Sequence, residues 1–175
     1  HQHFSDIQKL PNLHAMIALL RDGFHPQSEG GSIELAGDGT PIIDYVINDY
    51  LWDGVRRSWL SMAEIQFAAG AKAVRASHVD SPWFTSWEEA KAGINALEFR
   101  SNAFTAGSAH CMGGLTMGED QTRCLVDSNG KYHHLDNLYV FDGSVFPTSI
   151  GANPQLSIYG MACKQANKLL ETLKA

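Results

Sequence analysis

The chain has 175 residues, of which 44% are hydrophobic and 18% charged, and this composition is typical of a folded globular protein with one full domain or two small units. Its 19 acidic and 13 basic residues give a formal charge of −6, which leaves no basic face for a run of phosphates and argues against a nucleic-acid partner. No apolar run is long enough to span a bilayer, so no transmembrane segment is predicted.

The number and spacing of the cysteines give information on the cellular compartment. Cys111, Cys124 and Cys163 are odd in number and far apart, which argues against a disulfide framework. A reducing compartment fits slightly better, so the cytoplasm is slightly favoured over the periplasm. The localisation stays open, because a processed chain would have lost any signal peptide.

The first half of the chain predicts helices and one hairpin. Apolar residues at helical spacing between Leu13 and Leu20 predict a short helix, followed by a loop. Two apolar stretches flank an Asp38-Gly39 turn, which predicts a β-hairpin over residues 32–48. Residues 53–69 carry apolar side chains along one side of a helix that Gly70 is expected to end.

A strand and a capped helix are expected next. The segment AKAVRAS, residues 71–77, reads as a strand. Ser86 and Glu89 have the spacing of a capping box, in which the serine accepts from the glutamate amide and the glutamate answers back. This pair predicts a helix that runs to about Leu97.

From Phe104 onward the chain changes in character. Residues 105–118, TAGSAHCMGGLTMG, are rich in glycine and small residues and must hold their shape by backbone contacts. Two strands are predicted around an Asn129-Gly130 turn, at 122–127 and 131–135, and then a buried strand at 137–142. The final helix is expected to begin at Asn153. No internal repeat and no linker between independent domains is evident.

The start of the final helix is a candidate site. Asn153 is a favoured N-cap residue, and Pro154 suits the first helical position because its missing donor would have no partner there. The free amides of that turn also favour negative charge. Helix capping alone explains an isolated Asn-Pro pair. The interpretation as a functional site therefore depends on other residues that accompany the pair.

His110 is the second candidate. It is the one histidine of eight bracketed by so much small-residue sequence, which would let a planar ligand lie against the backbone. A metal site of His110, Cys111 and Cys124 lacks paired ligand spacing, and no metal is predicted. Ser108 suggests a hydrolase, but no GxSxG elbow presents it.

Taken together, three stretches resemble a known family. HCMGGLTMG (110–118), VDSNGKYHHLDNLYVFDGSVFPTS (126–149) and GANPQLSI (151–158) are similar, in order, to the carboxyl-terminal part of the glucose-methanol-choline (GMC) oxidoreductases, flavin enzymes that oxidise alcohols. The resemblance covers about residues 104–172 and is looser upstream. Where the family commonly has His-Pro-x-Gly-Thr, this chain has His110-Cys111-Met112-Gly113-Gly114, so the local backbone, and with it the substrate pocket, is expected to differ.

The resemblance implies an architecture. It implies an α+β fold in which residues 1–103 form a substrate-binding region, an antiparallel sheet backed by helices, and residues 104–175 form a flavin-facing segment whose helix packs on an FAD-binding domain. The GxGxxG loop that binds FAD in such enzymes is absent from these 175 residues. We therefore expect a fragment of a larger enzyme that does not retain FAD by itself.

The resemblance also implies roles for single residues. His110 is the catalytic base that takes the alcohol proton as hydride leaves for the flavin, and Asn153 orients the same hydroxyl. The FAD-contacting residues implied are Ala109, Asp142, Gly143, Asn153, Pro154 and Gln155. The partners implied are a small-molecule alcohol, the missing FAD-binding domain and an electron acceptor, with oxygen, a quinone and a cytochrome all left open. A catalytically silent binding module with an oxidoreductase-like shell is the alternative.

Overall fold

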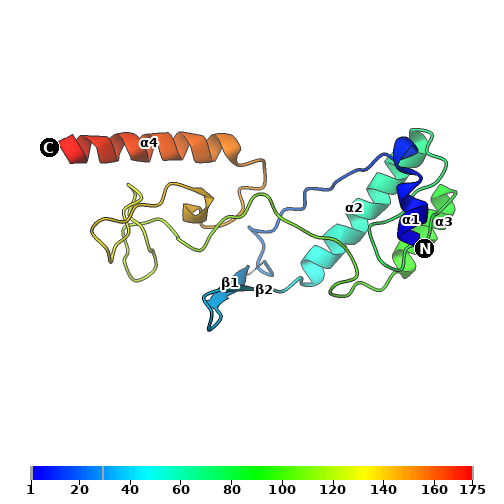
Figure 1. Cartoon of the computed structure of the whole chain (residues 1–175), viewed down its shortest axis with the longest axis horizontal. Helices are drawn as coiled ribbons and strands as arrows, with labels where there is room; N and C mark the ends of the chain where they lie inside the picture. The colour runs from blue at the N-terminus through cyan, green and yellow to red at the C-terminus, as the bar shows by residue number, and fades with distance from the viewer. Residues whose placement is uncertain (1, 29, 175) are drawn as a thin grey trace. The chain divides into compact units, whose positions relative to one another are not determined.

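A computed structural model describes residues 2–28 and 30–174, and Figure 1 shows its helices and strands in chain order. The chain divides into two compact units. The first contains residues up to Leu20 and Trp52–Phe104, and the second contains Arg21–Leu51 and the chain from Thr105. The hairpin is thus grouped with the carboxyl-terminal segment, so the division at 103/104 expected from sequence stays a prediction about the larger enzyme.

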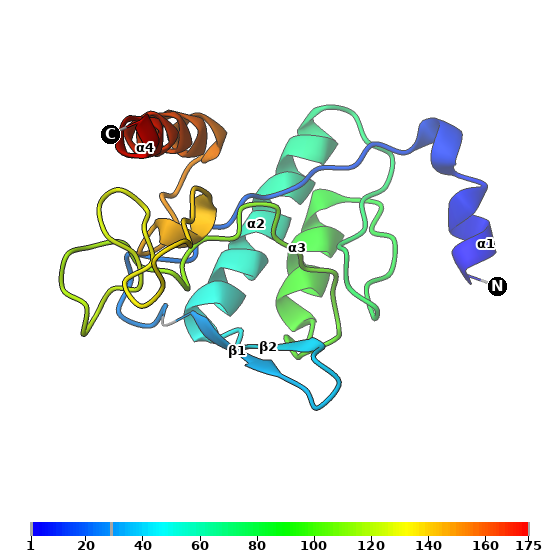
Figure 2. The same cartoon turned by 60° about the vertical axis from the view of Figure 1, so that its left-hand side comes forward.

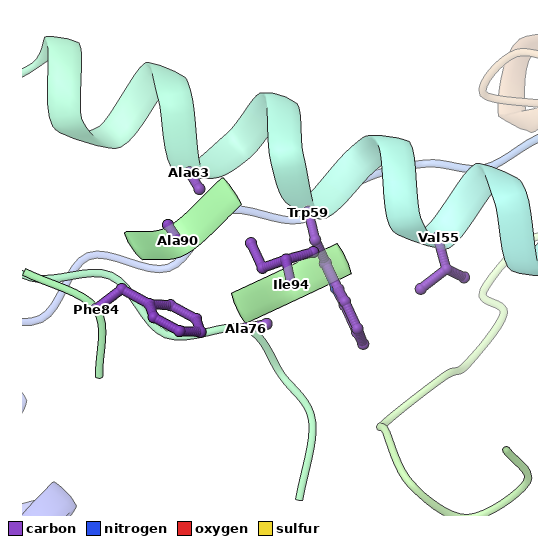
Figure 3. Close-up of a cluster of buried hydrophobic side chains, with 7 residues drawn as sticks. All are labelled: Val55, Trp59, Ala63, Ala76, Phe84, Ala90 and Ile94. Atoms are coloured by element: carbon purple, nitrogen blue, oxygen red, sulfur yellow. The ribbon is translucent and has the colours of Figure 1, made fainter. Parts of the chain in front are cut away.

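The first unit is helical. It contains α1 (Gln2–Ile7), the short 3-10 helix η1 (Leu10–Asn12), most of α2 (Asp49–Ala68) and α3 (Trp87–Ala96). Helices α2 and α3 lie side by side in Figure 1 and Figure 2. The two helices and the segment between them share one core, whose members are Val55, Trp59, Ala63, Ala76, Phe84, Ala90 and Ile94 (Figure 3).

Helix α2 confirms the predicted helix over 53–69 but begins earlier. Asn48 Oδ1 accepts a hydrogen bond from Leu51 N at 3.1 Å and so satisfies a free amide of the first turn. The buried residues Val55, Trp59 and Ala63 follow one another at intervals of four, which is the spacing of one helix face. The helix ends before Gly70, as predicted.

Helix α3 confirms the serine cap and corrects its partner. Ser86 Oγ accepts from Glu89 N at 3.2 Å. Glu89 Oε2 reaches back to Thr85, accepting from its N and its Oγ1 at 2.9 Å each, rather than to the amide of Ser86. These two hydrogen bonds from Thr85 lower the pKa of the Glu89 carboxyl.

The helix predicted between Leu13 and Leu20 is wrong, because these residues have no regular secondary structure. Their apolar side chains gain no buried face, and Ile17 is 84% exposed. A helix this short has little stability without tertiary packing. The segment is instead held by single contacts within the unit, such as the 2.9 Å hydrogen bond between His14 Nδ1 and Gln66 Nε2.

The strand predicted at 71–77 is reduced to one antiparallel bridge between Val74 and Phe84. Ser81 Oγ accepts from Ala76 N, and Ser81 O accepts from Arg75 Nε, so side chains satisfy groups that a strand would pair. The buried His78 is structural: its two ring nitrogens bond Glu98 O at 3.0 Å and Asp80 N at 3.1 Å.

The second unit contains the confirmed hairpin. Strands β1 (Gly31–Leu35) and β2 (Pro41–Tyr45) pair antiparallel, with Ile33 opposite Ile43. Thr40 N donates to Asp38 Oδ1 at 2.9 Å in the turn. Alternate residues of both strands share one face, and this apolar face is exposed, with Ile33 at 70% and Ile43 at 69%. The small antiparallel sheet and the helices make the chain an α+β protein, as predicted.

The strands predicted at 122–127, 131–135 and 137–142 are wrong as continuous strands. They appear as isolated bridges, Val126 with Tyr132 and Lys131 with Tyr139. Asp127 Oδ1 accepts from Asn129 N at 2.8 Å and from Lys131 N at 2.9 Å, so its side chain takes amides that would otherwise be free to form a ladder.

The chain closes with η2 (Gly143–Val145) and the long helix α4 (Gln155–Lys174). The one buried residue of α4 is Gln165, which is 2% exposed and whose Nε2 lies 3.5 Å from Met117 Sδ. The apolar side chains Leu156, Tyr159, Leu170 and Leu173 of α4 are exposed. Over residues 2–28 and 30–174, the structure has no helix with the length and apolar character needed to cross a bilayer.

Candidate functional site

The glycine-rich segment is held by backbone pairing within the second unit. Leu115 N donates to Ser144 O at 3.0 Å, and Met117 N donates to Val145 O at 3.3 Å. These bonds fix the chain that follows His110 against the turn at η2. The sequence expectation that this segment relies on backbone contacts is confirmed.

Gly143 is the point where three parts of the second unit meet. A Cβ on Gly143 would lie 2.9 Å from Cys111 O, 3.3 Å from Ile158 Cδ1 and 3.8 Å from Met112 Cγ. Cys111 follows His110 directly, and Ile158 belongs to the first turns of α4. Only glycine permits this approach, so the chain beside His110, the η2 turn and the start of α4 are packed together here.

The side chain of Asp142 starts η2. Its Oδ1 accepts hydrogen bonds from Ser144 N at 2.8 Å and from Ser144 Oγ. The residue is exposed, and it follows irregular chain instead of the predicted buried strand. One carboxylate oxygen is therefore committed to the turn, and a ligand would have to use the other or the neighbouring backbone.

His110 is half-buried, and Ala109 before it is exposed. The backbone amide of His110 donates to Ser108 Oγ at 3.2 Å. Within residues 2–28 and 30–174, its imidazole makes no hydrogen bond or ion pair. The ring is thus held by its backbone rather than by a side-chain partner, and both nitrogens are available to a substrate.

Helix α4 starts as the Asn-Pro pair predicts, within two residues. Asn153 Oδ1 accepts a long hydrogen bond of 3.4 Å from Gln155 N, and Pro154 O accepts from Ile158 N at 2.9 Å. Pro154 is buried, whereas Asn153 and Gln155 are exposed. The amides of this turn have no intrahelical acceptor, so the helix start favours negative charge.

Sequence reasoning missed the segment Arg21–His25, which lies against the loop that leads to Asn153. A Cβ on Gly23 would meet Thr148 Oγ1 and would lie 3.3 Å from Ser149 N, and a Cβ on Gly151 would meet the side chain of Arg21. The contacts join residues more than a hundred positions apart, and no local motif signals them.

Charge in this segment is also unusual. Asp22 Oδ1 is buried without a hydrogen-bond partner among the described residues. Burial raises the pKa of the Asp22 carboxyl, because the charged form loses hydration. No three histidine, cysteine, aspartate or glutamate side chains in the described part of the chain gather to hold a metal ion.

The residues present fit the flavin that the sequence resemblance implies. Gly143 admits a close backbone approach, α4 offers free amides, and His110 carries an imidazole, a group able to accept a proton. The structure packs the neighbours of His110 and the start of α4 together at Gly143. The individual roles of Ala109, His110, Asp142, Asn153, Pro154 and Gln155 remain predictions.

Comparison with known proteins supports the same family. The family model described as GMC oxidoreductase matches residues 26–162. An uncharacterised GMC-type oxidoreductase of Sinorhizobium fredii is 29% identical over 150 residues, which cover 83% of this chain and 28% of that protein.

Two relatives with named activities match shorter stretches. The 6'''-hydroxyparomomycin C oxidase of Streptomyces lividus is 37% identical over 84 residues, 48% of this chain and 15% of the relative. A long-chain-alcohol oxidase of Arabidopsis thaliana is 34% identical over 67 residues, 38% of this chain and 9% of the relative. The chain therefore spans less than a third of the length of these relatives. It belongs to the GMC oxidoreductase family and corresponds to the carboxyl-terminal region of these oxidoreductases.

Proposed function

We propose that this chain forms the substrate-facing and flavin-facing wall of an FAD-dependent oxidoreductase that acts on the CH-OH group of alcohols. The observation that carries the proposal is the packing at Gly143, which joins the chain after His110 to the first turns of α4. These are the two segments whose sequences resemble the catalytic part of the family.

His110 acts as the base in this proposal. Its imidazole accepts the hydroxyl proton of the alcohol, and the alkoxide character so created makes the carbinol hydride a better leaving group. FAD, when bound, supplies the acceptor for that hydride. Asn153 hydrogen-bonds the same hydroxyl oxygen and holds it in line, which is a contribution of geometry more than of charge.

The start of α4 supports the reaction electrostatically. The free amides of its first turn, near Asn153 and Pro154, favour negative charge without having to reorganise. Asp142, Gly143, Gln155 and Ala109 would hold FAD beside this turn, with Gly143 allowing close backbone approach. No tight FAD binding is expected of the 175-residue chain alone, and a yellow, stoichiometric preparation of it would contradict this.

The outer face of α4 fits a contact with the FAD-binding domain. Exposed apolar side chains lie three, eleven and three residues apart along it, spacings that return to one side of a helix, and they form an apolar stripe of Leu156, Tyr159, Leu170 and Leu173. Replacing Leu170 by serine should lower the FAD content of the enzyme that contains this chain. Because Leu170 is exposed, the stability of the isolated chain should hardly change. If FAD content and the stability of the isolated chain fell together, the proposed contact between α4 and the FAD-binding domain would be contradicted.

The base assignment is tested with His110→Ala in the FAD-loaded enzyme that contains this chain. Flavin reduction by an alcohol under anaerobic conditions should slow by about a hundred- to ten-thousandfold, while FAD content stays unchanged. His134→Ala is the matched control, because His134 is exposed in the turn-rich part of the same unit. An unchanged reduction rate for His110→Ala would remove the assignment.

The substrate screen should include a long-chain alcohol and 6'''-hydroxyparomomycin C, since relatives are named as oxidases of these two. Flavin bleaching by one member identifies the class. No bleaching by any alcohol, with FAD fully bound, would favour the silent binding module instead.

A further inference from the structure

We propose that Arg21 is a positioning residue for Asn153 and acts through Gly151. The inference rests on the proposed function, because it concerns the residue expected to orient the alcohol. It adds a segment from the other end of the sequence, Arg21–His25, to the wall of the candidate site.

The contact between Arg21 and Gly151 is close. A Cβ on Gly151 would lie 3.0 Å from Arg21 Nη1 and 3.2 Å from Arg21 Nε, and it would also meet Arg21 Cδ. Gly151 has a φ of +70°, a conformation that side chains rarely adopt. The arginine side chain therefore lies in close contact with a backbone turn whose φ favours glycine, two residues before Asn153.

Arg21 is itself held from several directions. Its guanidinium lies over the ring of Phe24, with Cζ 5.1 Å from the ring centroid. Its carbonyl accepts a long hydrogen bond of 3.5 Å from Tyr50 Oη, and Tyr50 stacks on His25 with ring centroids 4.0 Å apart. Arg21 is exposed, so its side chain is held by the contacts with Phe24 and Gly151, while Tyr50 holds its backbone.

The loop under Arg21 has few other restraints. Gly151 N donates to Ser149 Oγ at 3.3 Å, and Asn153 Oδ1 reaches Gln155 N only at 3.4 Å. Gly151, Ala152 and Asn153 are all exposed. Removing the arginine leaves this turn free to move, and small displacements of an orienting group are costly to a reaction that depends on alignment.

Charge is not the main requirement at this position. Among the described residues, Arg21 makes no ion pair with a carboxylate, so the planar guanidinium serves packing on Gly151 and Phe24. Lysine keeps the charge and the aliphatic stem but lacks the planar group. Arg21→Lys should therefore recover part of what Arg21→Ala loses.

The first experiment follows amide hydrogen exchange in the 175-residue chain. Arg21→Ala should speed exchange in a peptide covering residues 149–158 by on the order of tenfold, with a smaller effect for Arg21→Lys. Arg57→Ala is the control, because Arg57 is exposed and pairs with Asp53 on the surface of α2. Equal exchange in Arg21→Ala and the unchanged chain would overturn the proposal.

The second experiment is a double-mutant cycle on anaerobic flavin reduction in the FAD-loaded enzyme. Asn153→Ala and Arg21→Ala should each slow reduction, and the double variant should be little slower than Asn153→Ala alone, because Arg21 acts through Asn153. Additive losses would overturn the positioning role. If Asn153→Ala leaves the rate unchanged, the proposed function of Asn153 fails instead, and the positioning role falls with it even if the exchange result holds.

Discussion

Different kinds of contact stabilise the interior of each unit. The first unit buries seven apolar side chains from α2, α3 and the segment between them (Figure 3). Among the described residues of the second unit, the buried apolar side chains are Val126, Val145 and Pro154, and backbone hydrogen bonds and close glycine contacts hold the segments. The first unit therefore depends on side-chain volume, and the second depends on the absence of side chains at particular positions.

The largest effect should come from emptying the core of the first unit. Ile94→Ala removes a side chain with no exposed surface and should lower the free energy of unfolding by about 2–5 kcal/mol. All four tryptophans lie in the first unit, so their fluorescence during denaturation reports its unfolding. Ile65→Ala, at a position that is 53% exposed on α2, should cost far less. Similar losses for the two variants would refute the core description.

A smaller effect is expected from adding one methyl group to the second unit. Gly143→Ala places a Cβ against Cys111 O and Ile158 Cδ1 and should destabilise this unit by about 1–3 kcal/mol, as overpacking does. Hydrogen exchange in peptides of α4 measures the effect. Gly160→Ala has nothing within 4 Å and should instead stabilise the helix slightly. A neutral Gly143→Ala would mean that the close contact is not needed.

Helix caps give the next effect and sharpen the contrast. Ser86→Ala removes the 3.2 Å cap of α3 and should cost about 1 kcal/mol. Asn153→Ala removes the longer contact of 3.4 Å at α4, so its stability loss should be smaller. Thermal denaturation of both variants decides the order, and a larger loss for Asn153→Ala would show that the α4 cap is stronger than its length suggests.

The smallest effects concern pH and have opposite signs in the two units. Burial raises the pKa of Asp22, so its contribution to stability is present at low pH and is lost as pH rises through the raised folded value. Asp22→Asn should therefore stabilise the second unit at neutral pH, by no more than about 1 kcal/mol.

Glu89 titrates in the other direction. The hydrogen bonds from Thr85 lower its pKa, so its contribution is present above the ordinary glutamate pKa and is lost as pH falls through the lowered folded value. Unfolding curves of Asp22→Asn and Glu89→Gln across acid and neutral pH test both signs. If the stability change caused by each substitution varied with pH in the same direction, the opposite pKa shifts of Asp22 and Glu89 would be contradicted.

The same difference explains what the sequence could predict. Helices α2 and α3 were predictable because Val55, Trp59 and Ala63 repeat at helical spacing and Ser86 and Glu89 mark a start. The hairpin was predictable from its turn. The strands at 122–142 were not, because Asp127 diverts backbone amides in a way that no period reveals.

The candidate site shows a similar limit. The helix start at Asn153 could be read locally, since Asn-Pro is a capping pair. The contacts of Gly143 with Cys111 and of Gly151 with Arg21 could not be predicted, because they join distant parts of the chain. In the sequence, the glycine is the one sign of each contact. A single glycine is compatible with a turn, a helix end or a close contact, so it does not identify the segment that packs against it.

The exposed face of the hairpin has a practical consequence for work with the chain in solution. The β1–β2 sheet has two strands and presents Ile33, Leu35, Ile43 and Tyr45 to water, beside strand edges on which another strand can add. Such ribbons template intermolecular association, which the net charge of −6 opposes only weakly at high salt. Dilute, low-salt buffers should keep the chain monodisperse, and concentration should drive it toward aggregates.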